Sequence, residues 1–352
     1  MIGRPELQVN TQHYRGRNPG ERNLWKAVKK AIQDYDRFLL CTHRDPDADG
    51  VGSELALSAA LKEMGKEPVI LNPDTLPHVL RFLDPAGEVI GYDVLEREEA
   101  LRLLDEAQAI FFLDASVWTR LHPMDQEVSQ RAYKVLCIDH HPADQPLTPG
   151  SVVYERASST GELIFDLLAE LNHPVNDRVA FCLYTALVKD TGCFRYENTT
   201  SRVFEIAEQL ARYDSVLPNE IYDWLFERSS VTGVICLGKV LETLDFAYGQ
   251  RLAHISLTRR MIEQTGASRD ETENYIDVIR SIDPVRVCLY FRELDGGKIK
   301  VSFRSKTKEI DVNTLAEKFG GGGHKRASGA VIAGRLADVV KRVVDQAAEL
   351  FE

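Results

Sequence analysis

The sequence predicts an α/β fold: a mainly parallel sheet flanked by helices, followed by a smaller α+β domain, with a cleft between the two domains. In the first half of the chain, short apolar runs alternate with stretches of helical spacing, a pattern typical of a parallel sheet covered on both faces. Polar residues, often Asp or His, directly follow several of these runs. Beyond about residue 250 the segments become longer and strand-like, which predicts the second domain.

The strands of the first domain are predicted from its apolar runs. In chain order they cover residues 37–43, 67–72, 109–116, 133–141 and 152–155. Helical spacing predicts helices over 50–65, 158–172, 176–192 and 201–214. Ser159 and Glu162 have the spacing of a capping box, which indicates that the second of these helices begins near Ser159.

The second half is predicted to begin with a helical linker. Its expected strands cover 251–258, 285–294, 297–305 and 329–334, and its expected helices cover 268–281, 311–319 and 335–350. The predicted domain organisation is a polar N-terminal extension (1–23), an α/β domain (24–214), the linker (215–245) and the smaller domain (246–352).

Composition limits the class of protein. Hydrophobic residues make up 44% of the 352 residues and charged residues 28%, an ordinary balance for a globular protein. No apolar run reaches the roughly 18 residues expected of a membrane span, and the polar N-terminus lacks the apolar stretch of a signal peptide. The six cysteines are scattered and form no CxxC pair, which indicates free thiols in a reducing compartment. We therefore expect a cytoplasmic protein that does not bind membranes.

The charge of the chain argues against a protein that coats long nucleic acid. The formal net charge is -11, whereas such a protein needs a broad basic face. Residues 298–326 are an exception, with eight Lys and Arg against three acidic residues. This local basic segment is compatible with a short anionic substrate.

Clusters of Asp and His follow the predicted strands or end a helix. They are His43 with Asp47 and Asp49, then Asp114, then Asp139-His140-His141, and finally Asp190. One Asp at a strand end is most often a turn or a helix cap. Several together favour a common site, because ligands of open parallel sheets bind beyond the carboxyl ends of the strands.

The residue types in these clusters predict a metal site. Carboxylates with imidazoles suit Mn²⁺, with Mg²⁺, Co²⁺ or Fe²⁺ as alternatives, and a thiolate site is excluded because no cysteines cluster. The number of ligands suits two divalent cations better than one. Such a pair can share a hydroxide, direct it at phosphorus and neutralise charge on the leaving oxygen.

A glycine-rich segment is the second candidate for chemistry. Gly320 to Gly323 allow positive φ and close approach of backbone amides to an anion, and His324, Lys325 and Arg326 add donors. The competing interpretation is a flexible surface turn.

Five motifs resemble those of one known superfamily. HRDPDADG, FLDAS, IDHHP and VKDTGCF, in this order, resemble the motifs of the DHH phosphoesterases, and GGGGHKRASGA resembles the signature of the DHH-associated C-terminal domain. The combination is similar to the nanoRNase/pAp phosphatase group and covers about residues 24–350. The resemblance implies hydrolysis of short oligonucleotides, from dinucleotides to pentanucleotides, to mononucleotides, and of pAp to AMP.

The resemblance also implies a role for each motif residue. His43 and Asp47 are expected at the first metal, Asp49, His140 and Asp190 at the second, and Asp114 between the two, with a bridging hydroxide as nucleophile. His141 is expected to face the substrate phosphate, with Asp139 orienting a histidine. The expected substrate-binding residues of the C-terminal domain are Arg304, Ser305, Gly321, Gly322, Gly323, His324 and Arg326.

Several functions remain open at the level of sequence. The close alternative is a phosphodiesterase for cyclic dinucleotides of the c-di-AMP type or for pGpG, and the more distant one is a non-catalytic nucleotide sensor. An inorganic pyrophosphatase should lack GGGGHKRASG, and a RecJ-type exonuclease should be larger and more basic. The expected partners are short single-stranded RNA or DNA or small nucleotides, and the resemblance adds the expectation of a homodimer.

Overall fold

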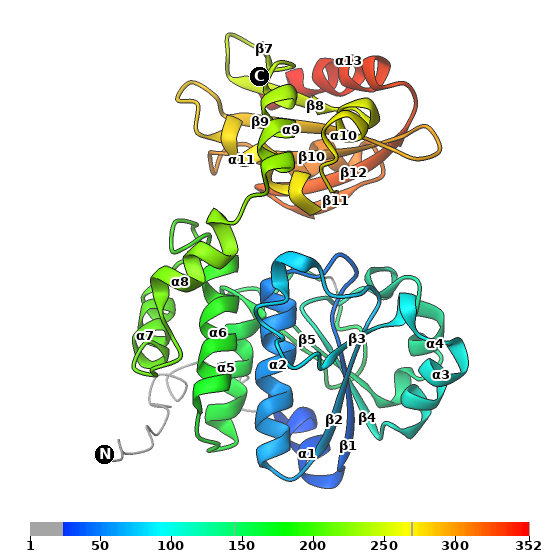
Figure 1. The fold of residues 1–352 in the computed structure, drawn as a ribbon, viewed down its shortest axis with the longest axis vertical. Helices are drawn as coiled ribbons and strands as arrows, with labels where there is room; N and C mark the ends of the chain where they lie inside the picture. The colour runs from blue at the N-terminus through cyan, green and yellow to red at the C-terminus, as the bar shows by residue number, and fades with distance from the viewer. Residues whose placement is uncertain (1–23, 144, 269, 352) are drawn as a thin grey trace. The chain divides into compact units, whose positions relative to one another are not determined.

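The computed structural model describes residues 24–143, 145–268 and 270–351. The predicted N-terminal extension, residues 1–23, lies outside these ranges. The chain separates into two compact units between Arg228 and Ser229, so the predicted linker spans this boundary (Figure 1). Each unit has its own sheet and its own hydrophobic core.

The sheet of the first unit is entirely parallel. Its strands are β1 (Arg37–Cys41), β2 (Glu67–Asn72), β3 (Val89–Gly91), β4 (Ala109–Leu113), β5 (Val135–Asp139) and β6 (Val152–Val153). They lie in the order β3-β2-β1-β4-β5-β6. The chain moves outward from β1 to β3, returns to β4 beside β1, and then moves outward in the other direction. The switch point of this doubly wound sheet therefore lies between β1 and β4.

Helices cover both faces of this sheet. They are α1 (Lys26–Asp34), α2 (Ala48–Glu63), α3 (Arg97–Glu106), α4 (Asp125–Ser129), α5 (Thr160–Glu170), α6 (Asp177–Asp190), α7 (Ser201–Leu210) and α8 (Pro218–Tyr222), with short turns η3 (His78–Leu80), η4 (Tyr92–Val94), η5 (Trp118–Leu121), η6 (Ala132–Lys134) and η7 (Asp223–Glu227). Phe38 and Leu40 of β1 pack into the core shared with α1, α2, α5 and α6. Leu39 and Cys41 pack into the core shared with α3 and α4, as the alternation of a strand requires (Figure 1).

Helix α2 is almost entirely buried in the first unit. Thirteen of its 16 residues are buried. A Cβ at Gly52 would lie 2.7 Å from the carbonyl oxygen of Cys182, and one at Gly50 would collide with the Thr42 hydroxyl. The two glycines therefore let the first turn of α2 approach β1 and α6 closely, which carries Asp47 and Asp49 to the switch point.

The second unit contains a mixed sheet. Its strands are β7 (Asp245–Ala247), β8 (Leu252–Leu257), β9 (Val287–Leu294), β10 (Lys298–Ser305), β11 (Gly322–His324) and β12 (Ala327–Ala333). They lie in the order β11-β12-β10-β9-β8-β7 and pair antiparallel except for β8 with β9. Its helices are α9 (Val231–Leu241), α10 (Arg259–Thr265), α11 (Ile276–Arg280), α12 (Val312–Glu317) and α13 (Leu336–Gln346), with turns η8 (Asp270–Tyr275) and η9 (Ala347–Leu350).

The two faces of this second sheet are covered differently. One face packs along β9, β10 and β12 against α12 and α13. The other packs over β8 and β9 against α9, α10 and α11. The side chains that β10 presents on this second face, Lys300, Ser302 and Arg304, are only partly buried. A partly open polar surface therefore continues from the covered part of this face.

The predicted parallel sheet flanked by helices and the smaller α+β domain are both confirmed. The strands found are mostly shorter than the predicted apolar runs, because the polar residues that follow each run lie in loops. The sequence did not predict α1, α3, α4, α10, β3 or β7, and it assigned no strand where β11 lies. All six cysteines are unpaired thiols. In the described ranges no helix has both the length and the apolarity needed to cross a membrane.

Candidate metal centre

The predicted metal ligands of the first unit lie together at the switch point. Ligand atoms lie within 4.8 Å of one another in each of three groups: His43, Asp47 and Asp114; Asp49, His140 and Asp190; and Asp114, His140 and His141. They come from the ends of β1, β4 and β5, the start of α2 and the end of α6. Five elements of the fold thus converge on one centre.

Asp114 occupies the middle of this centre. Its backbone has φ of 61°, a conformation that non-glycine residues rarely adopt outside functional or strained positions. Its Oδ2 lies 3.4 Å from Nε2 of His43, and its Oδ1 lies 3.5 Å from Nε2 of His140. The carboxylate therefore directs one oxygen toward each ligand group.

The first group is oriented by hydrogen bonds. Nδ1 of His43 donates to the carbonyl oxygen of Arg44 at 2.7 Å, which leaves the lone pair of the neutral ring on Nε2, toward Asp114. Asp47 caps α2 by accepting from the amide of Asp49 through Oδ1, and its Oδ2 lies 3.1 Å from Nζ of Lys189. His43 thus directs Nε2 at the centre, whereas the two oxygens of Asp47 are held by the start of α2 and by Lys189.

The second group contains a buried histidine nitrogen that lies near carboxylates without forming a hydrogen bond to them. Nε2 of His140 lies 3.1 Å from Oδ2 of Asp190 and 3.7 Å from Oδ2 of Asp49. It is buried, and no hydrogen bond of acceptable geometry satisfies it within the described part of the chain. A buried polar nitrogen surrounded by carboxylates in this way is suited to a cation between them.

His141 differs from its neighbour His140. Its Nδ1 lies 2.8 Å from Oδ1 of Asp139, and the same oxygen accepts from the His141 backbone amide at 3.0 Å. Asp139 is fully buried, whereas the side chain of His141 is 30% exposed. Asp139 thus fixes the ring of a histidine that reaches the surface of the centre.

The electrostatics of the centre indicate a need for cations. Burial raises the pKa of Asp49 well above its usual value, and the carboxylates of Asp114 and Asp190 raise it further. Burial opposes ionisation of Asp114 as well, but the neighbouring imidazoles of His140 and His43 hold its pKa well below the usual range. Burial would lower the pKa of His140, yet Asp114 and Asp190 raise it well above its ordinary value.

The donors therefore fit divalent cations. Four carboxylates, those of Asp47, Asp49, Asp114 and Asp190, share a small volume with imidazoles and one ammonium group, that of Lys189. Unbalanced buried charge is costly, and a divalent cation at each end of Asp114 would relieve it. Mixed carboxylate and imidazole donors suit such ions.

Comparison with known proteins agrees with this geometry. Residues 37–187 match the DHH family, N-terminal domain, and residues 250–352 match the DHHA1 domain. A Thermus thermophilus protein, the bifunctional oligoribonuclease and PAP phosphatase NrnA, is 31% identical over 341 residues, which cover 94% of this chain and 97% of that protein. The chain belongs to the DHH family.

Two further DHH relatives extend over most of the chain. The protein of the same name from Bacillus subtilis is 31% identical over 306 residues, which cover 86% of this chain and 91% of the relative. The crystal structure of an exopolyphosphatase-related protein from Bacteroides fragilis is 27% identical, with a TM-score of 0.84, and covers 93% of this chain and 96% of that one.

The DHHA1 domain arranges its predicted substrate residues on different faces. Ala327 pairs with both His324 and Arg304, so these two side chains belong to one row across β11, β12 and β10. Ser305 belongs to the opposite face, is 3% exposed, and donates from Oγ to the carbonyl oxygen of Thr307. Arg304 and His324 thus share a face that Ser305 does not.

Arg326 is engaged with the backbone near the end of β10. Its Nε lies 3.3 Å from the carbonyl oxygen of Ser305, and its Nη2 lies 3.0 Å from that of Lys306. These bonds tie the turn between β11 and β12 to β10. Its assignment to the substrate stays a prediction, as do the other assigned roles.

The four glycines of the DHHA1 signature have separate structural requirements. Gly320 has φ of 72° and Gly323 has φ of 146°. A Cβ at Gly321 would collide with the carbonyl oxygen of Gly329, whereas one at Gly322 meets nothing within 4 Å. The glycines thus allow β11 to pack closely on β12, and of the four only Gly322 combines open space with the absence of a positive φ.

We expect Gly321→Ala to destabilise the protein and Gly322→Ala to leave stability almost unchanged. Overpacking at Gly321 should lower the free energy of unfolding by about 1–3 kcal/mol. Urea unfolding of both variants measures the difference. Equal stability of the two would contradict the packing described for β11.

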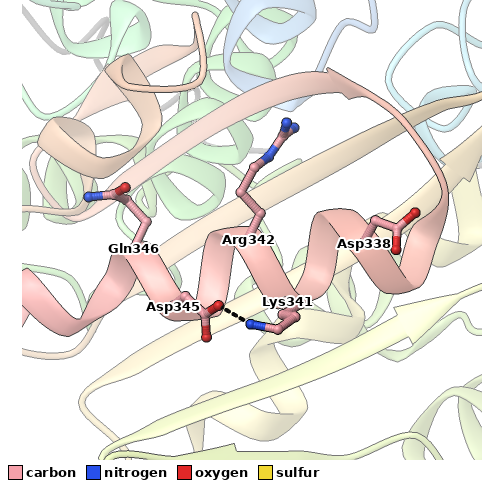
Figure 2. A pocket seen from close by; sticks show the side chains of 5 residues that line it. All are labelled: Asp338, Lys341, Arg342, Asp345 and Gln346. Atoms are coloured by element: carbon pink, nitrogen blue, oxygen red, sulfur yellow. Dashed lines mark hydrogen bonds and ion pairs between the residues drawn. The ribbon is translucent and has the colours of Figure 1, made fainter.

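A hollow on the DHHA1 domain differs from the metal centre of the first unit. Asp338, Lys341, Arg342, Asp345 and Gln346 line a space of about 450 Å³ along α13 (Figure 2). All five come from one helix, and Lys341 pairs with Asp345. None of the three groups of possible metal ligands found among the described residues lies in this hollow, so we assign it no chemistry.

Two neighbours of the metal centre were not predicted. Lys189 precedes the predicted ligand Asp190, and both its ion pair with Asp47 and the charge of Asp190 raise its pKa. Thr160 donates its hydroxyl to Asp114. The capping box at Ser159 already indicated that a helix begins at Thr160, but nothing in the local sequence connected that helix with Asp114.

Proposed function

We propose that the chain hydrolyses short oligonucleotides to mononucleotides, and pAp to AMP, with two divalent cations, Mn²⁺ above all. The observation that carries this proposal is the position of Asp114, which directs one oxygen toward His43 and Asp47 and the other toward His140. In this proposal His43 and Asp47 would hold one cation, Asp49, His140 and Asp190 would hold the other, and Asp114 would serve both groups. Bound there, the cations would supply an acidified water and neutralise charge on the phosphate.

The protein residues supply orientation around these cations. Asp139 holds Nδ1 of His141, so we assign Nε2, the other ring nitrogen, to a non-bridging oxygen of the substrate phosphate. The partial exposure of His141 supports this assignment. Because Nδ1 donates to Asp139, Nε2 donates only when the ring is protonated, and such an imidazolium would stabilise negative charge as it develops at phosphorus.

The substrate class is inferred from charge and from the relatives. Short nucleotides suit a chain of net charge -11 that has a local excess of basic residues in 298–326. The relatives from Thermus thermophilus and Bacillus subtilis are named oligoribonuclease and PAP phosphatase. Arg304 and His324, which share one face of the DHHA1 sheet, are the proposed contacts for a terminal phosphate. The unpaired thiols agree with a cytoplasmic location, and we also expect a homodimer.

A comparison of three substrates in Mn²⁺ tests the reaction. A 5′-phosphorylated dinucleotide, pAp and a cyclic dinucleotide are incubated separately with the full-length chain, and the products are separated by chromatography. We expect mononucleotide from the first and AMP from the second, both faster than ring opening of the third. Fast hydrolysis of the cyclic substrate alone would favour a cyclic dinucleotide phosphodiesterase, and binding without hydrolysis of any substrate would favour a nucleotide sensor.

Arg304→Ala is expected to weaken substrate binding more than turnover. Loss of one charge-assisted contact to a terminal phosphate should raise KM about tenfold or more, because such a bond contributes about 1.5–3 kcal/mol. Steady-state kinetics with the phosphorylated dinucleotide measures this, and a dinucleotide without the 5′-phosphate serves as control. The proposed contact is wrong if the variant loses as much affinity for the unphosphorylated dinucleotide.

A further inference from the structure

The N-terminus of α5 contacts the metal centre from a direction that the motifs do not include. We infer that Thr160 is a positioning residue for the cations: its hydroxyl orients Asp114, and its amide, with that of Gly161, orients Asp49. The inference rests on the proposed metal-dependent function. It concerns the arrangement of the carboxylates and adds no ligand to the set.

The hydroxyl of Thr160 decides how Asp114 presents its oxygens. Oγ1 of Thr160 donates to Oδ1 of Asp114 at 2.9 Å, inside a fully buried environment. The torsion between Cβ and the carboxylate of an aspartate is otherwise broad, so a fixed donor selects one orientation. The selected orientation directs Oδ2 toward His43 and Oδ1 toward His140.

The backbone of the same helix end holds Asp49. Oδ2 of Asp49 accepts from the Thr160 amide at 2.8 Å, and Oδ1 accepts from the Gly161 amide at 2.9 Å. A helix N-terminus stabilises negative charge, so this contact counteracts the burial of Asp49. Two of the four carboxylates, those of Asp49 and Asp114, are therefore oriented by two consecutive residues of α5.

Thr160 is not needed to cap its own helix. Ser159 is the N-cap, and its Oγ accepts from the amide of Glu162 at 3.0 Å. The Glu162 carboxylate accepts in return from the amide and the hydroxyl of Ser158, both at 2.8 Å. Because these bonds complete the cap, the Thr160 hydroxyl is available to Asp114, and its removal should leave the start of α5 intact.

The position of α5 is fixed by its packing on α6. A Cβ at Gly161 would lie 2.6 Å from Cβ of Ala186 and 3.4 Å from Oδ1 of Asp49, so only glycine allows this approach. Nδ2 of Asn198 donates to the carbonyl oxygens of Ser158 and Asp190, at 2.8 and 3.0 Å. These contacts hold the N-terminus of α5 beside the end of α6, which carries Asp190.

Two matched pairs of variants at residue 160 test the inference. Wild-type Thr160 and Thr160→Val differ by a hydroxyl, as do Thr160→Ser and Thr160→Ala. We expect the two chains without the hydroxyl to bind Mn²⁺ about 10–100-fold more weakly than their partners, as is typical of outer-shell residues of metal sites. Isothermal titration calorimetry on the full-length, metal-depleted chain measures this, and thermal unfolding verifies that each variant folds.

The outcome distinguishes orientation from packing. If Thr160 acts only by packing, affinity follows the methyl group, so that Thr160→Val binds as wild type and Thr160→Ser does not; this result overturns the inference. A wild type that binds Mn²⁺ with the expected hydroxyl dependence but hydrolyses no nucleotide would overturn the proposed function and leave the inference standing. Should Thr160→Val fail to fold, the Ser and Ala variants decide alone.

Discussion

Replacing Asp114 by alanine is expected to reduce hydrolysis of a phosphorylated dinucleotide by about a thousandfold or more, because several kcal/mol of transition-state stabilisation are lost with the cations. Asp114 lies between the two ligand groups, with its oxygens 3.4 Å from His43 and 3.5 Å from His140. It is also the group that the protein holds in an unfavourable backbone conformation and keeps ionised despite burial. Steady-state turnover with saturating Mn²⁺ measures the effect.

Two control variants locate the cause of this loss. Asp114→Asn keeps the size of the side chain and an oxygen for the Thr160 hydroxyl, but removes the charge, so we expect it to be nearly as inactive as alanine. Asp338→Ala removes an exposed carboxylate of α13 in the other unit and should retain wild-type activity. An Asp114→Asn variant with wild-type turnover would show that Asp114 acts by shape alone, against the proposed role.

Removal of divalent cations is expected to abolish activity and to lower the melting temperature. Four neighbouring carboxylates repel one another without cations, and a ligand present at 100 times its Kd stabilises the folded state by about 2.7 kcal/mol. Dialysis against a chelator followed by scanning calorimetry and activity assays measures both effects. Mn²⁺ should restore activity more effectively than Mg²⁺.

The same experiment can contradict the metal centre. A chelated chain that retains full activity and an unchanged melting temperature would rule out dependence on a cation that a chelator removes. The Asp114→Ala variant serves as its reference, because its melting temperature should respond much less to added Mn²⁺. An equal response of variant and wild type would place the stabilising cation elsewhere.

The sequence could predict that the acidic clusters lie close together, because this follows from the topology of a parallel sheet. Apolar runs identify β1, β4 and β5, and the carboxyl ends of parallel strands lie at one edge of the sheet. His43, Asp114 and His140 had to be neighbours once these strands were adjacent. Asp190 ends a helix, so the argument from strand ends does not place it, and only the motif resemblance assigned it to the second metal.

The contacts that were missed depend on packing between distant segments. Thr160 reaches Asp114 across 46 positions and Asp49 across 111, and no local pattern encodes the approach of α5 to β4 and α2. The grouping of Arg304 with Ser305 overlooked the alternation of a strand, in which neighbouring side chains point to opposite faces. Strand β11 could not be predicted because two of its three residues are glycines, which have no side chain and therefore show no alternation of polar and apolar positions.

Mononucleotide release from a 5′-phosphorylated dinucleotide, beside a 20-mer with the same 5′ end, is the most direct test of the proposed function. The full-length chain is loaded with Mn²⁺, and the two substrates are followed by chromatography at equal concentration. We predict rapid and complete conversion of the dinucleotide and much slower release from the 20-mer. No mononucleotide from either substrate, or release from the 20-mer at the same rate, would contradict the account of a metal-dependent hydrolase for short nucleotides.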